Sequence, residues 1–269
     1  MPKVQLEMAV RSLVKTAVET YAAGFRDRHF MEHKDPDGTI NMKIHNVFVA
    51  ALGPEIQYFT ALVRSLDSSL GNMLEALAVN IAGLSFDVHR SVEGPLSLEQ
   101  TRGIAELLEK YKRREITPHA KDYAILRKRP KSRRTPVKRH DTDYYLINKV
   151  TGEHVLIELK IGGDLDNKKA RSEKEAILEQ YAILSNTLPA NTPIRIFFAT
   201  AYNRFGEGKP WRQERVRQFF AEDELLVGAD FWNFICQSPK GYEWVIAEYQ
   251  ANSRLIVGAL DAIKKLYLG

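Results

Sequence analysis

The segment from Asp141 to Lys160 constrains the fold more than any other part of the chain. It reads DTDYYLINKVTGEHVLIELK, with two runs rich in aliphatic and aromatic residues on either side of Thr151-Gly152. Such runs around a turn signal predict a β-hairpin. Successive side chains of a strand point to opposite faces, so Glu158 and Lys160 share one face and Leu159 takes the other.

The hairpin would bring three charged side chains together at its open end. A two-residue loop at Thr151-Gly152 places Asp143 opposite Lys160 and diagonal to Glu158. Two carboxylates and an ammonium inside an apolar hairpin are costly to bury unless they pair or hold a metal. Carboxylates suit a hard cation such as Mg²⁺. Asp141 shares the face of Asp143 and is the rival for the first metal ligand.

The spacing of these residues resembles the PD-(D/E)xK nuclease core, with Thr142 in the position of the motif's proline. Further motifs occur in order along the chain: Ser69-Leu-Gly-Asn-Met-Leu-Glu75, Gly163-Asp-Leu-Asp-Asn-Lys-Lys-Ala-Arg171, Tyr202-Asn-Arg-Phe-Gly-Glu-Gly-Lys-Pro-Trp211 and Glu224-Leu-Leu-Val-Gly-Ala-Asp-Phe-Trp-Asn-Phe234. Together they resemble type II restriction endonucleases of the TdeIII type, which act on GGNCC sites. The resemblance covers about residues 40 to 250.

This resemblance implies an α/β fold with a mixed central sheet flanked by helices, a helical N-terminal part and C-terminal helices. It implies Mg²⁺-dependent hydrolysis of double-stranded DNA by a homodimer, with a DNA methyltransferase as functional partner. The catalytic residues would be Asp143, Glu158 and Lys160, and the metal ligands Asp143, Glu158 and the backbone carbonyl of Leu159. Glu75 is a further catalytic candidate, although an exposed helical glutamate is an equally good interpretation of that residue.

Sequence-specific cleavage also requires side chains that reach base edges, and Arg and Lys are the usual partners of guanine. Salt bridges and phosphate contacts are the alternative roles for each candidate. The DNA-binding candidates are Lys168, Lys169, Arg171, Asn167, Asn203, Arg204, Arg133 and Arg134.

Positive charge is concentrated in residues 110–139, which hold thirteen Lys and Arg against Glu115 and Asp122. The whole chain has a formal charge of only +5. A segregated basic stretch that leads directly to Asp143 is typical of a protein that neutralises phosphates. A solvated basic loop is the alternative.

Composition excludes several other classes of protein. No apolar run is long enough to span a membrane, and the first residues lack a signal-peptide core, so we expect a soluble, intracellular protein. The resemblance to restriction endonucleases implies the cytoplasm of a prokaryote. The single cysteine, Cys236, cannot form an internal disulfide, and its aromatic neighbours predict a buried thiol. His29, His33 and His45 match no ligand spacing and are expected at the surface.

We expect one nuclease domain over residues 1–269, with a mainly helical part (1–109), the basic stretch (110–139), a catalytic core (140–236) and C-terminal helices (237–269). Apolar periodicity predicts a helix over residues 3–24 and two helices within 55–84 that break near Asp67–Gly71. Capping-box patterns predict helices after Ser97 and Ser172. Residues 192–201 predict a buried strand parallel to the one that ends at Lys160. Later elements are expected at 211–220 (helix), 224–227 (strand), 230–236 (helix) and 242–268 (one or two helices).

Three functions fit these features. A sequence-specific restriction endonuclease agrees with all of them. A structure-specific or repair nuclease would use the same core, and a non-catalytic basic nucleic-acid-binding protein would not need the complete trio of Asp143, Glu158 and Lys160.

Overall fold

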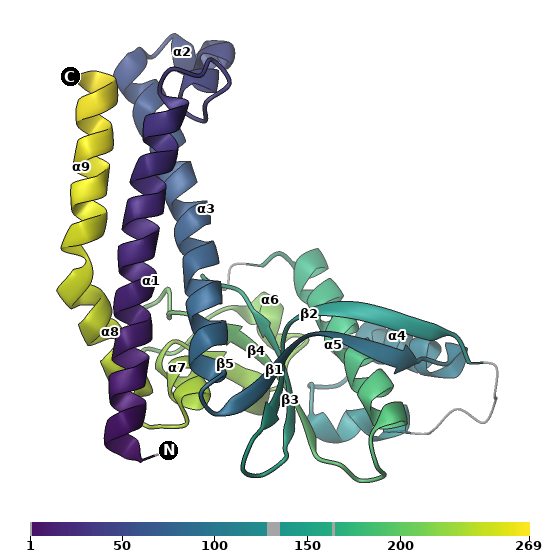
Figure 1. Ribbon diagram of the computed structural model, residues 1–269. Helices are drawn as coiled ribbons and strands as arrows, with labels where there is room; N and C mark the ends of the chain where they lie inside the picture. The colour runs from purple at the N-terminus through teal and green to yellow at the C-terminus, as the bar shows by residue number, and fades with distance from the viewer. Residues whose placement is uncertain (1, 128–134, 163–164) are drawn as a thin grey trace. The chain divides into compact units, whose positions relative to one another are not determined.

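The computed structural model of the protein describes residues 2–127, 135–162 and 165–269 (Figure 1). The chain divides into two compact units, a helical unit of residues 1–80 and 243–269 and a sheet unit of residues 81–242. In chain order the elements are α1 (Lys3–Glu32), η1 (Asn41–His45), α2 (Val47–Ala50), α3 (Pro54–Ala82), β1 (Phe86–Pro95), α4 (Leu98–Lys112), η2 (Ala120–Arg127), β2 (Val137–Asn148), β3 (His154–Leu159), α5 (Asn167–Thr187), β4 (Ile194–Thr200), α6 (Glu214–Arg217), η3 (Glu222–Glu224), β5 (Leu225–Val227), α7 (Ala229–Cys236), α8 (Gly241–Asn252) and α9 (Arg254–Leu268).

The helical unit is built around α1, which lies beside α9 (Figure 1). The predicted helix over residues 3–24 is confirmed, but Gly24 does not end it, because Phe25 and His29 continue its buried face for two further turns. The expectation of a surface position is therefore wrong for His29. The buried core of this unit consists of Phe25, Ile40, Tyr58, Ala61, Leu62 and Ile263.

Helix α3 is continuous, so the predicted break near Asp67–Gly71 is wrong. The hydroxyl of Ser69 donates to the carbonyl of Ser65 at 2.7 Å and lies 3.0 Å from the hydroxyl of Tyr21 on α1. Tertiary packing of this kind overrides the weak helix propensity of serine and glycine.

The sheet unit holds a five-stranded mixed sheet in the order β1-β2-β3-β4-β5. The first three strands pair antiparallel, and β3, β4 and β5 pair parallel. The predicted mixed sheet and the predicted parallel strand within residues 192–201 are confirmed. Strand β1 was not predicted, because its sequence FDVHRSVEGP lacks a regular apolar alternation.

Helices cover both faces of the sheet. Leu156, Ile196 and Phe198 share a buried core with residues of α4 and α5. On the opposite face, Phe197 packs against Phe234 of α7 with ring centroids 5.3 Å apart. Cys236 at the end of α7 is buried as expected, and burial raises the pKa of its thiol to about 12.

The helices of the sheet unit follow the predictions in part. The capping box at Ser97 is confirmed at the start of α4. The one at Ser172 is wrong, because α5 begins earlier and the carboxylate of Asp166 caps it by accepting the Lys169 N–H at 2.8 Å. The helix expected over residues 211–220 is only the single turn α6. The strand β5, the helix α7 and the two C-terminal helices α8 and α9 lie where they were predicted.

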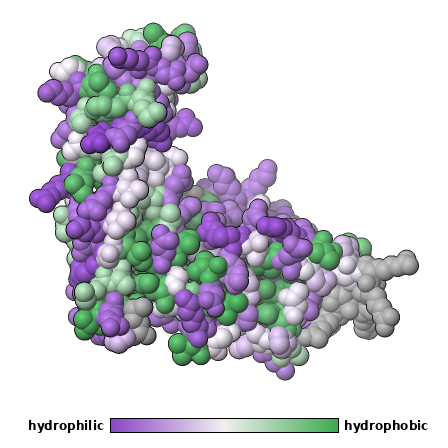
Figure 2. Space-filling view, in the orientation of Figure 1, coloured by the Kyte–Doolittle hydropathy of each residue, from purple (hydrophilic) through white to green (hydrophobic). Residues whose placement is uncertain are grey.

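The outer surface mixes polar and apolar residues over the face that Figure 2 presents. Within the described parts of the chain, no helix has both the length and the apolar composition needed to cross a membrane.

Candidate active site

The hairpin of β2 and β3 pairs two residues away from the predicted register. Its ladder joins Tyr144 to Ile157 and Ile147 to His154. The connecting turn is longer than two residues, because the side chain of Asn148 accepts hydrogen bonds from the N–H groups of Val150 and Thr151. A shift of two residues leaves every side chain on its predicted face. The observed register places Asp143 opposite Glu158, whereas the predicted register placed it opposite Lys160.

An irregularity between β1 and β2 lies directly beside Asp143. The register shifts between His89 and Ser91, so that three residues of β2, Thr142 to Tyr144, oppose the single residue Arg90. The guanidinium of Arg90 donates to the carbonyl of Asp143 at 2.6 Å and thereby replaces a ladder hydrogen bond. The irregularity therefore lies at Asp143, and Arg90 binds the backbone carbonyl of that residue.

The predicted trio meets at the end of β3. One carboxylate oxygen of Asp143 accepts the Leu159 N–H at 3.0 Å. The Lys160 ammonium donates to Glu158 Oε1 at 2.5 Å. The backbone N–H of Lys160 donates to the carbonyl of Ala199 on β4 at 3.0 Å. A backbone N–H of β3 therefore orients the Asp143 carboxylate, and the side chains of Glu158 and Lys160 orient each other.

A fourth charged residue, Glu173 of α5, joins this group. Its Oε1 lies 3.3 Å from Lys160 Nζ, so the ammonium stands between two carboxylates. Sequence reasoning missed Glu173 because α5 was expected to begin near it. Arg90 was missed because β1 was not predicted. One signal in the sequence could have indicated Glu173. It is a charged residue in the first turns of the helix that follows β3.

The electrostatics of the site favour a bound cation. Burial is the main cause that raises the pKa of Glu158 to about 8, the carboxylate of Asp143 raises it further, and Lys160 opposes both. Burial also disfavours the ammonium of Lys160, but Glu158, Glu173 and Asp143 outweigh it and raise the pKa of Lys160. Lys160 therefore stays charged, and its single charge does not compensate the acidic residues around it.

The donor set fits Mg²⁺, which proteins commonly bind through one or two carboxylates together with waters and substrate phosphate oxygens. Asp143 and Glu158 supply two carboxylates from adjacent strands. Among the described residues, no three His, Cys, Asp or Glu side chains form a group that could hold a metal by themselves. A cation here would therefore take part of its coordination from water and substrate.

The rival first ligand, Asp141, is exposed and pairs elsewhere. Its side chain is 92% exposed, and its nearest ionic partner is Arg139 at 3.9 Å. Glu75 belongs to α3 in the helical unit, so its catalytic role stays a prediction. The side chain of Leu159 is buried, and a role for its carbonyl as a ligand also stays a prediction.

The DNA-binding candidates fall into distinct settings. Lys168 and Lys169 are exposed on the first turn of α5, and Arg204 is exposed after β4. Arg171 pairs with Glu109 of α4 at 2.9 Å. Asn203 is 9% exposed and braces its own loop, because its amide donates to the Lys209 carbonyl and its oxygen accepts the Phe205 N–H. Arg133, Arg134 and the side chain of Asn167 lie outside the described residues.

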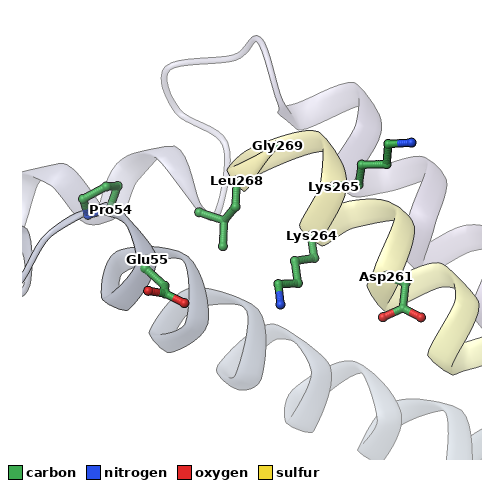
Figure 3. A pocket seen from close by; sticks show the side chains of 7 residues that line it. All are labelled: Pro54, Glu55, Asp261, Lys264, Lys265, Leu268 and Gly269. Carbon is green, nitrogen blue, oxygen red and sulfur yellow. The ribbon is translucent and has the colours of Figure 1, made fainter.

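A separate pocket lies away from this group. It has a volume of about 580 Å³ and lies in the helical unit between the start of α3 and the end of α9 (Figure 3). Its lining residues are Pro54, Glu55, Asp261, Lys264, Lys265, Leu268 and Gly269. Its lining holds neither Asp143 nor Glu158 nor Lys160, so the Asp143 group remains the candidate site.

Comparison with known proteins agrees with this geometry. The family model described as type II restriction endonuclease, HinfI, matches residues 6–251. No curated protein matches the chain. The match spans both units and includes Asp143, Glu158, Lys160 and Glu173. The chain therefore belongs to the HinfI family of type II restriction endonucleases, and this membership implies endonuclease activity on DNA.

Proposed function

We propose that this protein uses Mg²⁺ to hydrolyse both strands of DNA at a short palindromic site that contains GGNCC, as its resemblance to the TdeIII type implies. The observation that carries the proposal is the meeting of Asp143, Glu158 and Lys160 at the end of two neighbouring strands. A cognate DNA methyltransferase would protect the host's own sites.

Asp143 and Glu158 would hold the cation, with the Leu159 carbonyl as a further ligand. When bound, Mg²⁺ would supply Lewis-acid stabilisation of the negative charge that develops on the phosphate. The Leu159 N–H donates to the carboxylate of Asp143, and Arg90 donates to its backbone carbonyl. The carboxylate therefore needs no rearrangement to face the substrate.

Lys160 has the role of positioning and charge neutralisation. Its ammonium stays protonated between Glu158 and Glu173 and can donate to the attacking water or to a phosphoryl oxygen. A fixed donor aimed at developing charge is worth about 100- to 1,000-fold in rate. Lys168 and Lys169 on the first turn of α5 are proposed to contact the DNA, and Arg204 is proposed to do so after β4.

Digestion of phage DNA with the purified protein and Mg²⁺ tests this proposal. Sharp bands whose ends map to GGNCC are the expected result. Discrete bands at another sequence would refute the GGNCC assignment alone, whereas a smear would favour a structure-specific or repair nuclease. DNA modified by the cognate methyltransferase should resist cleavage.

Substitution separates catalysis from binding. Glu158→Ala and Lys160→Ala should abolish cleavage while gel-shift affinity for the duplex survives. A Glu158→Ala or Lys160→Ala variant that still cuts would rule out this active site.

A further inference from the structure

Strands β3 and β4 remain paired beyond the last residues of the regular sheet. The N–H of Lys160 donates to the carbonyl of Ala199 at 3.0 Å, and the N–H of Ala201 donates to the carbonyl of Ile161 at 3.2 Å. The two strands are parallel, so they end at the same edge of the sheet. The loop after β4 therefore begins beside the chain that leaves Lys160.

The register places Tyr202 on the face of the sheet that carries Glu158 and Lys160. Glu158 is paired with Phe198, and successive side chains of a strand alternate between the two faces. Four residues further along both chains, the same register pairs Gly162 with Tyr202. Because Gly162 has no side chain, the next side chain beyond Lys160 on this face is that of Tyr202.

The phenol of Tyr202 lies against the backbone of Gly162. A β-carbon added at Gly162 would be 2.8 Å from the Tyr202 hydroxyl oxygen and 3.5 Å from Cζ of the ring. The φ angle of Gly162 is outside the left-handed region, so the backbone conformation does not require glycine there. The close approach of the Tyr202 hydroxyl does require it.

Tyr202 is held in place although its side chain is 49% exposed. The hydroxyl of Thr200, a buried residue, donates to the Tyr202 carbonyl at 3.0 Å. The next residue, Asn203, braces the loop through its contacts with Phe205 and Lys209. Residues that bind substrates are often carried by loops that a rigid scaffold positions, so this arrangement favours a binding role for the phenol.

We propose that the Tyr202 hydroxyl donates a hydrogen bond to the DNA phosphate next to the scissile phosphate on the cleaved strand. This inference rests on the proposed function, which places the scissile phosphate at Asp143, Glu158 and Lys160. Tyr202 follows Lys160 along one face, as the phosphates of a DNA strand follow one another. Tyrosine is among the residues that contact phosphates and thereby fix the register of a protein on the duplex.

Tyr202→Phe tests the contact, because it removes the hydroxyl and keeps the ring. In gel shift without Mg²⁺, the affinity for a duplex with the mapped cleavage site should fall by about 10-fold, the effect of one hydrogen bond to a charged group. The salt dependence of the affinity should keep its wild-type slope, since the phenol carries no charge. Tyr249→Phe on α8 is the matched control and should bind like the wild type.

A methylphosphonate, which replaces one charged phosphate oxygen by a methyl group, identifies the partner of the hydroxyl. Each phosphate beside the scissile one is replaced in turn. At the contacted position, the ratio of wild-type affinity to Tyr202→Phe affinity should fall from about 10 to about 1, because the hydrogen bond is already lost. An unchanged ratio at every position, or wild-type affinity of Tyr202→Phe for the unmodified duplex, would overturn the proposal.

Gly162→Ala tests the geometry independently. Its β-carbon would clash with the Tyr202 hydroxyl at 2.8 Å, whereas Cζ at 3.5 Å is in ordinary van der Waals contact. Gly162→Ala should therefore weaken binding in the wild-type background and have no effect in the Tyr202→Phe background. An equal loss in both backgrounds would overturn the proposed position of the hydroxyl.

Cleavage by the wild type separates this inference from the proposed function. Discrete cleavage together with wild-type affinity of Tyr202→Phe would overturn the inference alone. A wild type that binds DNA without cutting it would overturn the proposed function, and a loss of affinity in Tyr202→Phe would then still identify Tyr202 as a DNA contact.

Discussion

The carboxylate of Asp143 accepts the Leu159 N–H at 3.0 Å and so ties β2 to the residue between Glu158 and Lys160. One oxygen of this carboxylate is thereby fixed by the backbone of the neighbouring strand. In the proposed function the other oxygen would bind the cation, with the carboxylate positioned by this backbone contact.

We expect Asp143→Asn to fold normally, because asparagine retains an oxygen that can accept the Leu159 N–H. Cleavage should fall by at least about 100-fold, since the variant lacks the charge that holds the cation. The measurement is the rate of plasmid cleavage at saturating Mg²⁺, together with duplex affinity in gel shift. Asp141→Asn is the matched control and should cleave normally, because Asp141 is exposed. The opposite result for the two variants would identify Asp141 as the ligand.

Glu173→Gln is expected to slow cleavage by about 10-fold, the effect typical of a residue that acts through a residue of the active site. Glutamine keeps a neutral contact to Lys160 but removes one of the carboxylates that raise its pKa. Glu173 also raises the pKa of Glu158, which is about 8, so the acidic limb of the pH–rate profile should move to lower pH. Glu175→Gln on the same helix serves as control, and an unchanged acidic limb in Glu173→Gln would exclude this role.

The hairpin shows why sequence reasoning located the charged trio despite a wrong register. Strand side chains repeat every two residues, so an error of two positions leaves each residue on its correct face. The turn could not be predicted because the side chain of Asn148, and not a two-residue loop, closes it.

Other features depend on contacts between distant residues and leave no local signal. Strand β1 is an edge strand, and its charged residues mask the apolar alternation. Helix α3 is continuous because Tyr21 and Ser65 satisfy the hydroxyl of Ser69. Arg90 reaches Asp143 across fifty-three positions of sequence.

Lys174 provides a test of stability. Its side chain is fully buried, and its ammonium contacts Glu224 Oε2 at 2.7 Å and the hydroxyl of Tyr123 at 2.5 Å. This network joins α5 to η2 and η3. Burial lowers the pKa of Lys174, and Glu224 opposes that effect.

Lys174→Met should destabilise the sheet unit by about 3–5 kcal/mol, because it leaves the Glu224 carboxylate buried without its cation. The double variant Lys174→Met/Glu224→Gln should recover most of that loss, since no unpaired charge then remains. Urea denaturation of both variants measures the difference. Equal destabilisation of the single and double variants would show that packing, and not charge, dominates at this position.

His29 makes the stability of the helical unit dependent on pH. Its ring is fully buried, lies 3.1 Å from the hydroxyl of Ser65 and packs edge-on against Phe25. Burial lowers the pKa of His29 below its ordinary 6.5, Arg28 lowers it further, and Glu32 opposes them. The unfolded chain therefore binds more protons than the folded chain just below pH 6.5.

The contribution of His29 to the free energy of unfolding is therefore fully present above about pH 6.5. It is lost as the pH falls from 6.5 through the lowered pKa of the folded state. Burial also lowers the pKa of His140 and His154, so these residues act in the same direction. His29→Gln should reduce the loss of urea midpoint between pH 7.5 and pH 5.5, whereas His45→Gln should not, because His45 is exposed. If the urea midpoint decreases equally in wild type and His29→Gln between these two pH values, His29 has the same pKa in the folded and unfolded states.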